Sequence, residues 1–237
     1  MFVEHEYYIG FRDIDFKNNL KIKSMFSYLE DTAGMHSNLV GFGLLDIPKN
    51  NRSWMLNSWR LEFKKRPHYA ENLKVKTWVR SIDKLYAYRD YEVFDESNEI
   101  VAIAESKWFL IDTENLKIAK LEDNMKDAYS LENKNVFETE SEKLKDPENY
   151  IDSCEIEITK TMIDLNGYVH NLDYIDFASH LLPYEIMQKA SKIEVLYKKE
   201  IKEGSKVKCL HAFKDKYHYV VIKSQDESTI HAIIKLC

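Results

Sequence analysis

Two kinds of hydrophobic spacing alternate along the chain. In residues 21–40 the apolar side chains recur three and four positions apart, at Met25, Phe26, Leu29 and Ala33. This spacing predicts an amphipathic helix. Segments with alternating, β-branched or aromatic residues lie on either side of it and are typical of strands. We predict strands over residues 3–9, 54–66, 72–81, 84–95 and 99–111.

A polar stretch interrupts this pattern, and the pattern then restarts. Residues 122–150 are rich in acidic and amide side chains, which favours a linker or a surface excursion. After it we predict a strand over 153–161, a helix over 172–190, and strands over 192–201, 205–214, 217–224 and 228–236. The predicted division is an N-terminal domain over residues 1–125, a linker over 126–150 and a C-terminal domain over 151–237.

The two halves of the chain are also similar in amino-acid sequence. FKKRPHYAENLKVKTW (63–78) is similar to YKKEIKEGSKVKCL (197–210), and DFKNNLKIKSMFSYLED (15–31) aligns with DLNGYVHNLDYIDFASH (164–180). Two matches in the same order indicate an internal duplication. In each copy the helix must bury its apolar stripe against the nearby face of an antiparallel sheet. A helix wrapped by a sheet is the hotdog arrangement, so we expect an α+β double hotdog.

Composition excludes several classes. The chain has no run of about 18 apolar residues, and its first residues are acidic where an export signal would be basic. A net charge of −6 argues against a nucleic-acid binder. Cys154, Cys209 and Cys237 show neither disulfide-framework nor zinc spacing, which fits reduced thiols. We therefore expect a cytoplasmic protein with no membrane segment, metal or cofactor.

The strongest candidate site is MIDLNGYVHN, residues 162–171. Asp164, Asn166, Tyr168 and His170 occupy alternate positions just before the second predicted helix. An acid can activate water, an amide can hold water or a carbonyl oxygen, and free N–H groups at a helix start can polarise a carbonyl. The alternative is that Asp164 and Asn166 only shape a turn and cap the helix, and His170 has the same structural alternative.

At this point the sequence resembles the acyl-ACP thioesterase family of plant plastids and bacteria, whose members are tandem hotdogs. The motif of that family runs Asp-x-Asn-x-His-x-Asn-Asn, with a Tyr three residues on, and Asp164, Asn166, Asn171 and Tyr174 are in register with it. The resemblance covers residues 5–236 and places the catalytic Glu of the family at Glu200, in YKKEIKEG (197–204). The first-half segments that carry it are GFGLL (41–45), WMLNSWRLEFKKRP (54–67), VKTWV (75–79) and ESKWFLID (105–112). Without the resemblance, Glu200 is typical of a solvent-facing strand residue.

Two positions depart from the family motif. Tyr168 stands where the family has its catalytic His, and His170 stands where it often has the first Asn. A phenol with an ordinary pKa of about 10 is not a base near pH 7. Either Tyr168 only donates a hydrogen bond, or His170 replaces the missing His, or the site is impaired. The second interpretation requires that residues 164, 166, 168 and 170 share one face of an extended segment.

The resemblance implies a thioesterase that hydrolyses fatty acyl-ACP to free fatty acid and holo-ACP in fatty acid biosynthesis. Asp164 and Glu200 would orient and activate water, and Asn166 would position the water or the carbonyl. The N–H groups near Gly167–Val169 would stabilise the oxyanion, and Tyr168 and His170 would tune the network. The alternatives are an acyl-CoA thioesterase and a non-catalytic acyl-binding double-hotdog protein.

The implied partner is acyl carrier protein bearing a phosphopantetheine-linked acyl chain. Basic residues at equivalent points of the repeat are candidates for a patch that receives this acidic partner: Lys64, Lys65, Arg66, Lys198 and Lys199. The alternative is that they are solvated strand charges. Two copies in one chain can satisfy the usual hotdog pairing, and formation of a homodimer stays open.

Overall fold

The computed structural model describes all residues, 1–237, and the chain divides into two compact units. Unit 1 is Met1–Glu140 and unit 2 is Ser141–Cys237. The sheet of unit 1 contains β1 (Val3–Tyr8), β2 (Arg52–Phe63), β3 (Asn72–Ile82), β4 (Ala87–Phe94) and β5 (Ile100–Asp112), with the short β6 (Lys117–Ala119) beside β5. Its strand order is β1-β3-β4-β5-β2, and every pair is antiparallel.

Unit 2 repeats this plan strand for strand. It contains β7 (Asp152–Glu157), β8 (Lys192–Tyr197), β9 (Lys206–Lys214), β10 (Tyr217–Ser224) and β11 (Ile230–Leu236). Their order is β7-β9-β10-β11-β8, again with every pair antiparallel. Because each strand of unit 2 takes the place of its counterpart in unit 1, the structure carries the duplication that the sequence indicates.

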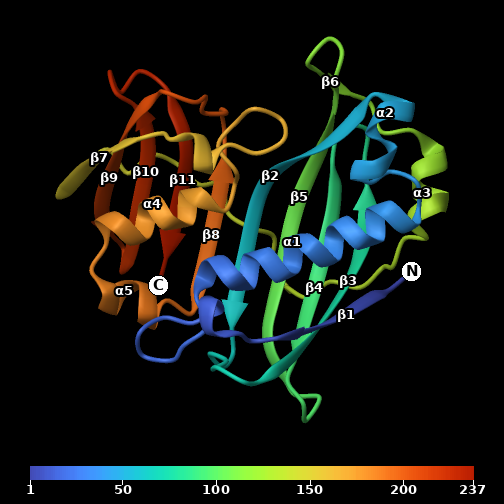
Figure 1. Cartoon of the computed structure of the whole chain (residues 1–237), viewed down its shortest axis with the longest axis horizontal. Coiled ribbons are helices and arrows are strands. Elements are labelled where there is room, and N and C mark those ends of the chain that lie inside the picture. The colour runs from blue at the N-terminus through green and yellow to red at the C-terminus, as the bar shows by residue number, and fades with distance from the viewer. The chain divides into compact units, whose positions relative to one another are not determined.

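The long helix of unit 1 is α1 (Ile22–Leu39), which confirms the helix predicted over 21–40. It lies across one face of the unit 1 sheet (Figure 1). Its buried stripe includes Met25, Phe26 and Leu29, each at most 1% exposed. The Phe26 ring lies 5.3 Å from that of Trp59 on β2. Each such fully buried side chain stabilises the fold by about 1.5–3 kcal/mol, so the stripe fixes the helix on the sheet.

The predicted helix over 172–190 is two helices in the structure. They are α4 (Asp173–Leu181) and α5 (Tyr184–Lys189). Pro183 stands between them, has no backbone N–H to donate, and disfavours helical geometry at Leu182, whose ψ is 143°. Short helical turns complete the chain: η1 (Phe11–Asp13), η2 (Leu44–Asp46), α2 (Ile47–Asn50), α3 (Asp123–Tyr129) and η3 (Lys160–Met162).

The segment predicted as a linker, residues 126–150, is packed onto the two units. Its start completes α3, where Met125 and Tyr129 are at most 2% exposed. It then follows the unit 1 sheet, where the Glu132 N–H donates to the Val79 carbonyl at 3.0 Å and Phe137 packs under Arg60. Within unit 2, Leu144 is buried with Val221 and Ile233. A few apolar residues in a polar stretch therefore decide its course.

A polar cluster lies inside unit 1 near the C-terminal end of α1. We call it the His36 cluster: His36, Ser37, Thr77, Arg89 and Tyr129, all buried. Arg89 donates to Nδ1 of His36 at 3.0 Å and to Oγ1 of Thr77 at 3.3 Å. Tyr129 donates its hydroxyl to Oγ of Ser37 at 2.9 Å. Burial, and then the charge of Arg89, lowers the pKa of His36 to about 3.

No helix is both long enough and apolar enough to cross a membrane.

The low pKa of His36 predicts a pH-dependent contribution to the free energy of unfolding. Between pH 6.5 and about 3 the unfolded chain binds a proton at His36 that the folded chain does not, so the free energy of unfolding falls as the pH falls through this window. The loss is at most about 1.4 kcal/mol per pH unit. Replacing His36 with Gln removes it, so we expect the stability of the wild type relative to His36→Gln to decrease from pH 6.5 to pH 4 in urea titrations.

The difference in free energy of unfolding between the wild type and His36→Gln excludes the contributions of other titrating groups, because both proteins contain them. Burial raises the pKa of Asp90 to about 6, which acts in the opposite direction but is common to both proteins. Parallel stability curves for wild type and variant over this range would show that His36 titrates normally in the folded state.

Candidate active site

A tight turn at Asp164 builds the framework of the candidate site. The segments on either side pair through an antiparallel bridge between Ile163 and Val169. One carboxylate oxygen of Asp164, Oδ1, accepts the N–H of Asn166 at 2.8 Å and that of Tyr168 at 3.3 Å. Gly167 has a φ of +82°, a left-handed conformation that glycine adopts without steric cost. We call residues 162–170 the Asp164 turn.

The second arm of the Asp164 turn lies beside the segment that follows β8. Tyr168 forms an antiparallel bridge with Lys202, and the N–H of Val169 donates to the carbonyl of Ile201 at 2.9 Å. Val169 and Ile201 both point into the core, with 6% and 1% exposure. Because side chains alternate across a strand, Tyr168, His170 and Glu200 belong to the other, outer face. The register sets His170 opposite Glu200.

Unit 1 contains the same framework with different side chains. Oδ1 of Asp15 accepts the N–H groups of Lys17 and Asn19, both at 2.9 Å, and the N–H of Leu20 donates to Pro67 at 2.8 Å. The bridges Ile14–Leu20 and Asn19–His68 match those of unit 2. At the positions of Asn166, Tyr168, His170 and Glu200, unit 1 has Lys17, Asn19, Lys21 and Arg66. Of the predicted set only Asp164 has an identical counterpart, so its carboxylate has a structural role shared by both units.

His170 also has a structural role. Its Nδ1 accepts the N–H of Leu172, the N-cap residue of α4, at 3.3 Å. Since Nδ1 is the acceptor, a neutral ring carries its proton on Nε2 and presents a donor there. This is the helix-capping alternative left open by the sequence. In this arrangement Nδ1 of His170 is occupied by the Leu172 N–H and is not placed to act as a base.

The structure contradicts the prediction that the N–H groups near Gly167–Val169 are available to stabilise an oxyanion. The predicted start of the helix, residue 172, agrees with α4, which begins at Asp173, so the N–H groups of Gly167–Val169 lie before the first helical turn and not in it. The N–H of Gly167 donates to Asp164 O at 3.1 Å, that of Tyr168 to the Asp164 carboxylate, and that of Val169 to Ile201 O. These donors hold the turn together and are already occupied. The Asn166 amide donates to Oδ2 of Asp164 at 3.4 Å, and the Tyr168 side chain lies on the outer face.

Tyr174, which matches the family motif but is not in the predicted catalytic set, lies near the carboxylates of the candidate site. It lies in the first turn of α4 and is 3% exposed. Burial, and then the negative charges of Glu200 and Asp164, raises the pKa of its phenol above the ordinary value. Its ring meets that of Tyr197 at 88°, and Tyr197 donates its hydroxyl to the Asn171 carbonyl at 2.9 Å. The signal was present in the duplication, where the counterparts of these two phenols are Met25 and Phe63.

The two basic clusters have different surroundings. Lys64 pairs with Glu62, Lys65 lies 3.9 Å from Asp95, and Arg66 donates to the Leu20 carbonyl at 3.2 Å. Lys198 and Lys199 are exposed, next to Glu200. Intramolecular contacts therefore neutralise or occupy the basic groups of unit 1, and those of unit 2 face solvent beside the site.

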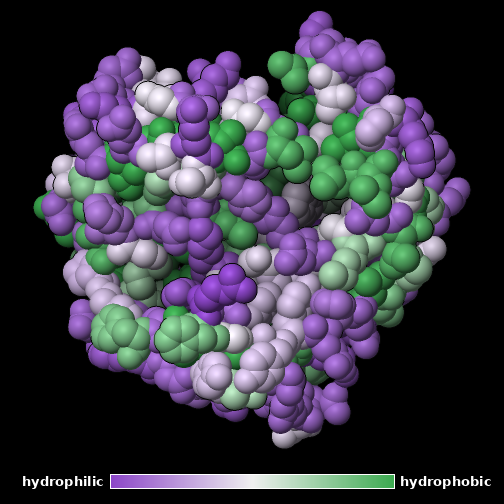
Figure 2. Space-filling model, viewed as in Figure 1, coloured by the Kyte–Doolittle hydropathy of each residue, from purple (hydrophilic) through white to green (hydrophobic).

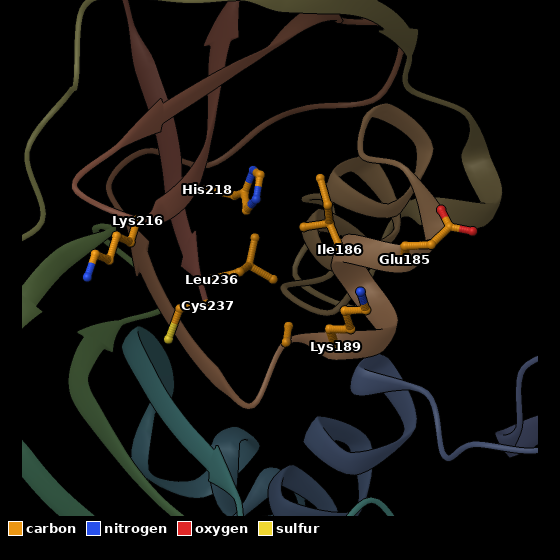
Figure 3. Close-up of a pocket in the computed structure, with 8 residues that line it drawn as sticks. Glu185, Ile186, Lys189, Lys216, His218, Leu236 and Cys237 are labelled. Carbon is orange, nitrogen blue, oxygen red and sulfur yellow. The ribbon is translucent and has the colours of Figure 1, made fainter.

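A pocket of about 340 Å³ lies elsewhere in unit 2, between α5 and the ends of β10 and β11 (Figure 3). Ile186 and His218 face one another across it, whereas Lys216 points away. None of the predicted site residues lines it. The structure has no group of three or more His, Cys, Asp or Glu side chains placed to hold a metal ion.

Because Asp15 and Asp164 make the same hydrogen bonds in their turns, we predict that removal of either carboxylate destabilises the fold by a similar amount. Asp15→Ala and Asp164→Ala each remove an acceptor of two backbone N–H groups, and we expect each to lower the free energy of unfolding by about 1–2 kcal/mol. Asn can accept the same bonds, so Asp15→Asn and Asp164→Asn should cost less. Urea denaturation of the four variants measures this. A cost at Asp15 with none at Asp164 would contradict a structural role for the second carboxylate.

The comparisons with known proteins agree with this architecture. Models of the acyl-ACP thioesterase N-terminal and C-terminal domains match residues 2–129 and 146–235. A chloroplastic oleoyl-acyl carrier protein thioesterase of Coriandrum sativum is 21% identical over 218 residues, which is 84% of this chain and 59% of that protein. A chloroplastic palmitoyl-acyl carrier protein thioesterase of Arabidopsis thaliana is 25% identical over 215 residues, 84% of this chain and 52% of that protein. The chain thus spans three fifths or less of the length of these relatives.

Solved structures confirm the double-hotdog α+β fold. An acyl-ACP thioesterase from Bacteroides thetaiotaomicron has a TM-score of 0.88 and 22% identity, covering 99% of this chain and 96% of that one. The 12:0-ACP thioesterase from Umbellularia californica has a TM-score of 0.85 and 15% identity, with the same coverage. The two domain models together match most of the sequence, and the chain belongs to the acyl-ACP thioesterase family.

Proposed function

We propose that this chain hydrolyses the thioester of fatty acyl-ACP, releasing free fatty acid and holo-ACP in fatty acid biosynthesis. The observation that carries the proposal is the difference between two equal frameworks. Around the Asp164 turn, unit 2 has an amide, phenols, an imidazole and a carboxylate where unit 1 has two lysines, an asparagine, an arginine and apolar side chains. The backbone hydrogen bonds that stabilise the turn are the same in both units. They do not account for the polar side chains that only unit 2 has, and we attribute those side chains to catalysis.

The proposed reaction is attack of water on the thioester carbonyl. Glu200, exposed on the outer face, takes a proton from the attacking water as the oxygen–carbon bond forms. The carbon–sulfur bond then breaks, and the thiolate of the phosphopantetheine group leaves and is protonated. The Asn166 amide and the Tyr168 hydroxyl donate to the carbonyl oxygen as its negative charge develops, and one such donor can be worth about 3 kcal/mol. His170 adds a donor through Nε2 beside Glu200.

Asp164 and Tyr174 support this arrangement from the inner side. Asp164 holds the Asp164 turn through two N–H groups, and its Oδ2 lies 3.4 Å from the Asn166 amide nitrogen. This contact orients the amide. Tyr174 stays a neutral donor near both carboxylates because its pKa is raised. Lys198 and Lys199 are placed to attract an acidic carrier protein toward Glu200.

The competing function is acyl binding without turnover. Tyr168 favours it, because a phenol stands where the family has its catalytic histidine, and the use of His170 Nδ1 in helix capping removes the most direct replacement. Hydrolysis of acyl-CoA is a further possibility for the same site chemistry. Turnover assays of the purified chain with acyl-ACP and acyl-CoA of several chain lengths separate the three functions. Absence of turnover above background with every thioester would refute the hydrolase.

The charge of two carboxylates is expected to matter for rate. Glu200→Gln and Asp164→Asn should each lower kcat at least about tenfold, because the first removes the proposed base and the second removes the charged acceptor that orients the Asn166 amide. The matched controls are Glu203→Gln, an exposed neighbour, and Asp15→Asn, the counterpart in unit 1. Steady-state rates on acyl-ACP measure this. An unchanged kcat in Glu200→Gln would remove Glu200 from the mechanism.

Tyr168→His tests the departure from the family. An imidazole at this position can still donate an N–H to the carbonyl oxygen in place of the phenol, and it adds a group that accepts protons near neutral pH, so we expect kcat to rise about tenfold or more. The pH profile should also gain an inflection near pH 6–7. A fall in kcat would instead indicate that the Tyr168 hydroxyl is a required donor in this chain.

A further inference from the structure

The loops around the Asp15 turn of unit 1 expose four aromatic side chains. We call them the aromatic rim: Tyr8, Phe11, Phe16 and Tyr69, which are 56%, 83%, 79% and 46% exposed. Exposed apolar residues that stand singly are ordinary on protein surfaces, whereas several gathered in one place usually mark contact with another molecule. The reaction proposed for unit 2 uses none of these four side chains.

The members of the aromatic rim come from two loops that are joined. Oδ1 of Asn18, two residues after Phe16, accepts the N–H of Tyr69 at 3.2 Å. The Tyr69 ring meets that of Tyr8 with centroids 6.4 Å apart, and Phe11 belongs to η1 in the loop before α1. The loop before α1 and the loop between β2 and β3 therefore form one surface. Figure 2 shows apolar side chains at the lower left of the molecule, where the loop before α1 lies in Figure 1.

The duplication shows that the fold does not require aromatic residues at these positions. The short helices η1 and η3 and the matching bridges of the two units define the correspondence. The exposed counterparts in unit 2 are Glu157, Lys160, Leu165 and Glu203. Three of these four side chains are charged, although the backbone framework is the same. The aromatic rim is therefore a feature of the unit 1 surface and not a requirement of the turn.

Two aspartates fix the backbone that presents the aromatic rim. Oδ2 of Asp13 accepts the N–H of Gly10 at 2.9 Å, and Oδ1 of Asp15 accepts two N–H groups of its own turn. Both carboxylates are half-buried. A loop that is already ordered loses less conformational entropy when it binds a partner, so the fixed backbone favours binding through the side chains that it exposes.

The exposed charges of the same loop are all positive. Arg12, Lys17 and Lys21 are exposed, whereas its two aspartates are turned toward the backbone. The Lys17 ammonium lies 5.9 Å from the centroid of the Phe16 ring. This local charge is opposite in sign to the net charge of −6 of the whole chain. The surface is therefore complementary to an anionic partner that also accepts apolar side chains.

We propose that the aromatic rim docks on the surface of an anionic lipid bilayer. A bilayer presents negatively charged phosphates with an apolar layer directly beneath them, and each phenylalanine of the loop is followed by a basic residue, as Phe11-Arg12 and Phe16-Lys17. The two phenylalanine rings enter the boundary between headgroups and acyl chains. The basic side chains reach back to the phosphates, because their apolar stems can follow the same surface.

The tyrosines of the aromatic rim fit the same partner. Tyrosine has an apolar ring and a polar hydroxyl, and such side chains are enriched at the level of lipid headgroups. Tyr8 and Tyr69 are less exposed than Phe11 and Phe16, as expected for residues at the edge of an inserting loop. An acidic protein surface would pair with the cations but would offer no continuous apolar layer to the rings.

Co-sedimentation of the full chain with lipid vesicles tests the proposal. The vesicles contain about two parts phosphatidylcholine to one part phosphatidylglycerol, and vesicles of phosphatidylcholine alone are the uncharged control. We expect partitioning onto the anionic vesicles to be at least about tenfold stronger, and to fall at least about fivefold in 1 M NaCl, where the Debye length is about 3 Å. Equal partitioning onto both kinds of vesicle would contradict an anionic partner.

The apolar arm of the test replaces the two phenylalanines together. Phe11→Ser with Phe16→Ser should reduce partitioning onto the anionic vesicles at least about tenfold, because it removes the inserted apolar area. The matched control is Leu116→Ser in the turn between β5 and β6, where the side chain is 66% exposed. This control should partition like the wild type. Equal losses in the two proteins would show that exposed apolar area in general, and not the aromatic rim, binds lipid.

The charge arm replaces single cations. Arg12→Gln and Lys17→Gln should each reduce partitioning about fivefold, since one basic residue near an anionic membrane contributes about 1 kcal/mol. Lys117→Gln, an exposed lysine next to Leu116, is the control and should have no effect. All substituted side chains are exposed, so we expect an unchanged Tm. The lipid and salt comparisons use the wild type and decide the question even if a variant does not fold.

Two other occupants of the aromatic rim would overturn the proposal. If the rim joins two copies of this chain, size-exclusion chromatography without lipid will show a dimer that Phe11→Ser with Phe16→Ser separates, and the wild type will not bind the vesicles. If the rim receives the carrier protein, the same variant will weaken binding of that protein and vesicle binding will again be absent. No arm measures turnover, so failure of the proposed hydrolase leaves the lipid-docking result unaffected.

Discussion

The site depends on one carboxylate that accepts two backbone N–H groups. Oδ1 of Asp164 binds the N–H groups two and four residues ahead and so turns the chain back on itself. Only after this turn can the arm that carries Tyr168 and His170 lie beside the segment that carries Glu200. Asp15 does the same in unit 1. The turn is therefore a structural element of both units, independent of the chemistry proposed for unit 2.

Duplication makes it possible to separate structural from chemical roles within one chain. Positions that serve packing keep their character in both units, as Val169 matches Leu20 and Ile201 matches Pro67. Positions that face outward around the turn differ sharply in charge. The inner phenols Tyr174 and Tyr197 replace Met25 and Phe63, so unit 2 has given up apolar packing for hydrogen-bond donors. The two phenols still pack edge-on against one another, and Tyr197 adds a hydrogen bond to the Asn171 carbonyl that Phe63 cannot make.

Unit 1 placed its own polar groups in a different region. Its Asp15 turn carries lysines, whereas its interior encloses Arg89 and His36. Burial of an unpaired guanidinium costs stability, and the low pKa of His36 prevents the ring from adding a second positive charge. A fold this rich in buried aromatic side chains can tolerate that cost. The two units therefore differ in where polar groups interrupt an otherwise similar core.

The sequence by itself determined the elements, their duplication and the position of the turn, because periodicity and turn-forming residues act over a few neighbours. It also placed Asp164, Asn166, Tyr168 and His170 in one segment, and only the family resemblance added Glu200; their catalytic roles stay predictions. Only the tertiary structure decided which hydrogen-bonding groups are already in use: the N–H groups of Gly167–Val169 close the turn, His170 Nδ1 caps α4, and residues 126–150 pack onto the sheets. It alone showed that Arg89 lacks a counter-ion. Partners of this kind are distant in sequence, and burial, which makes an unpaired group costly, exists only once the chain has folded.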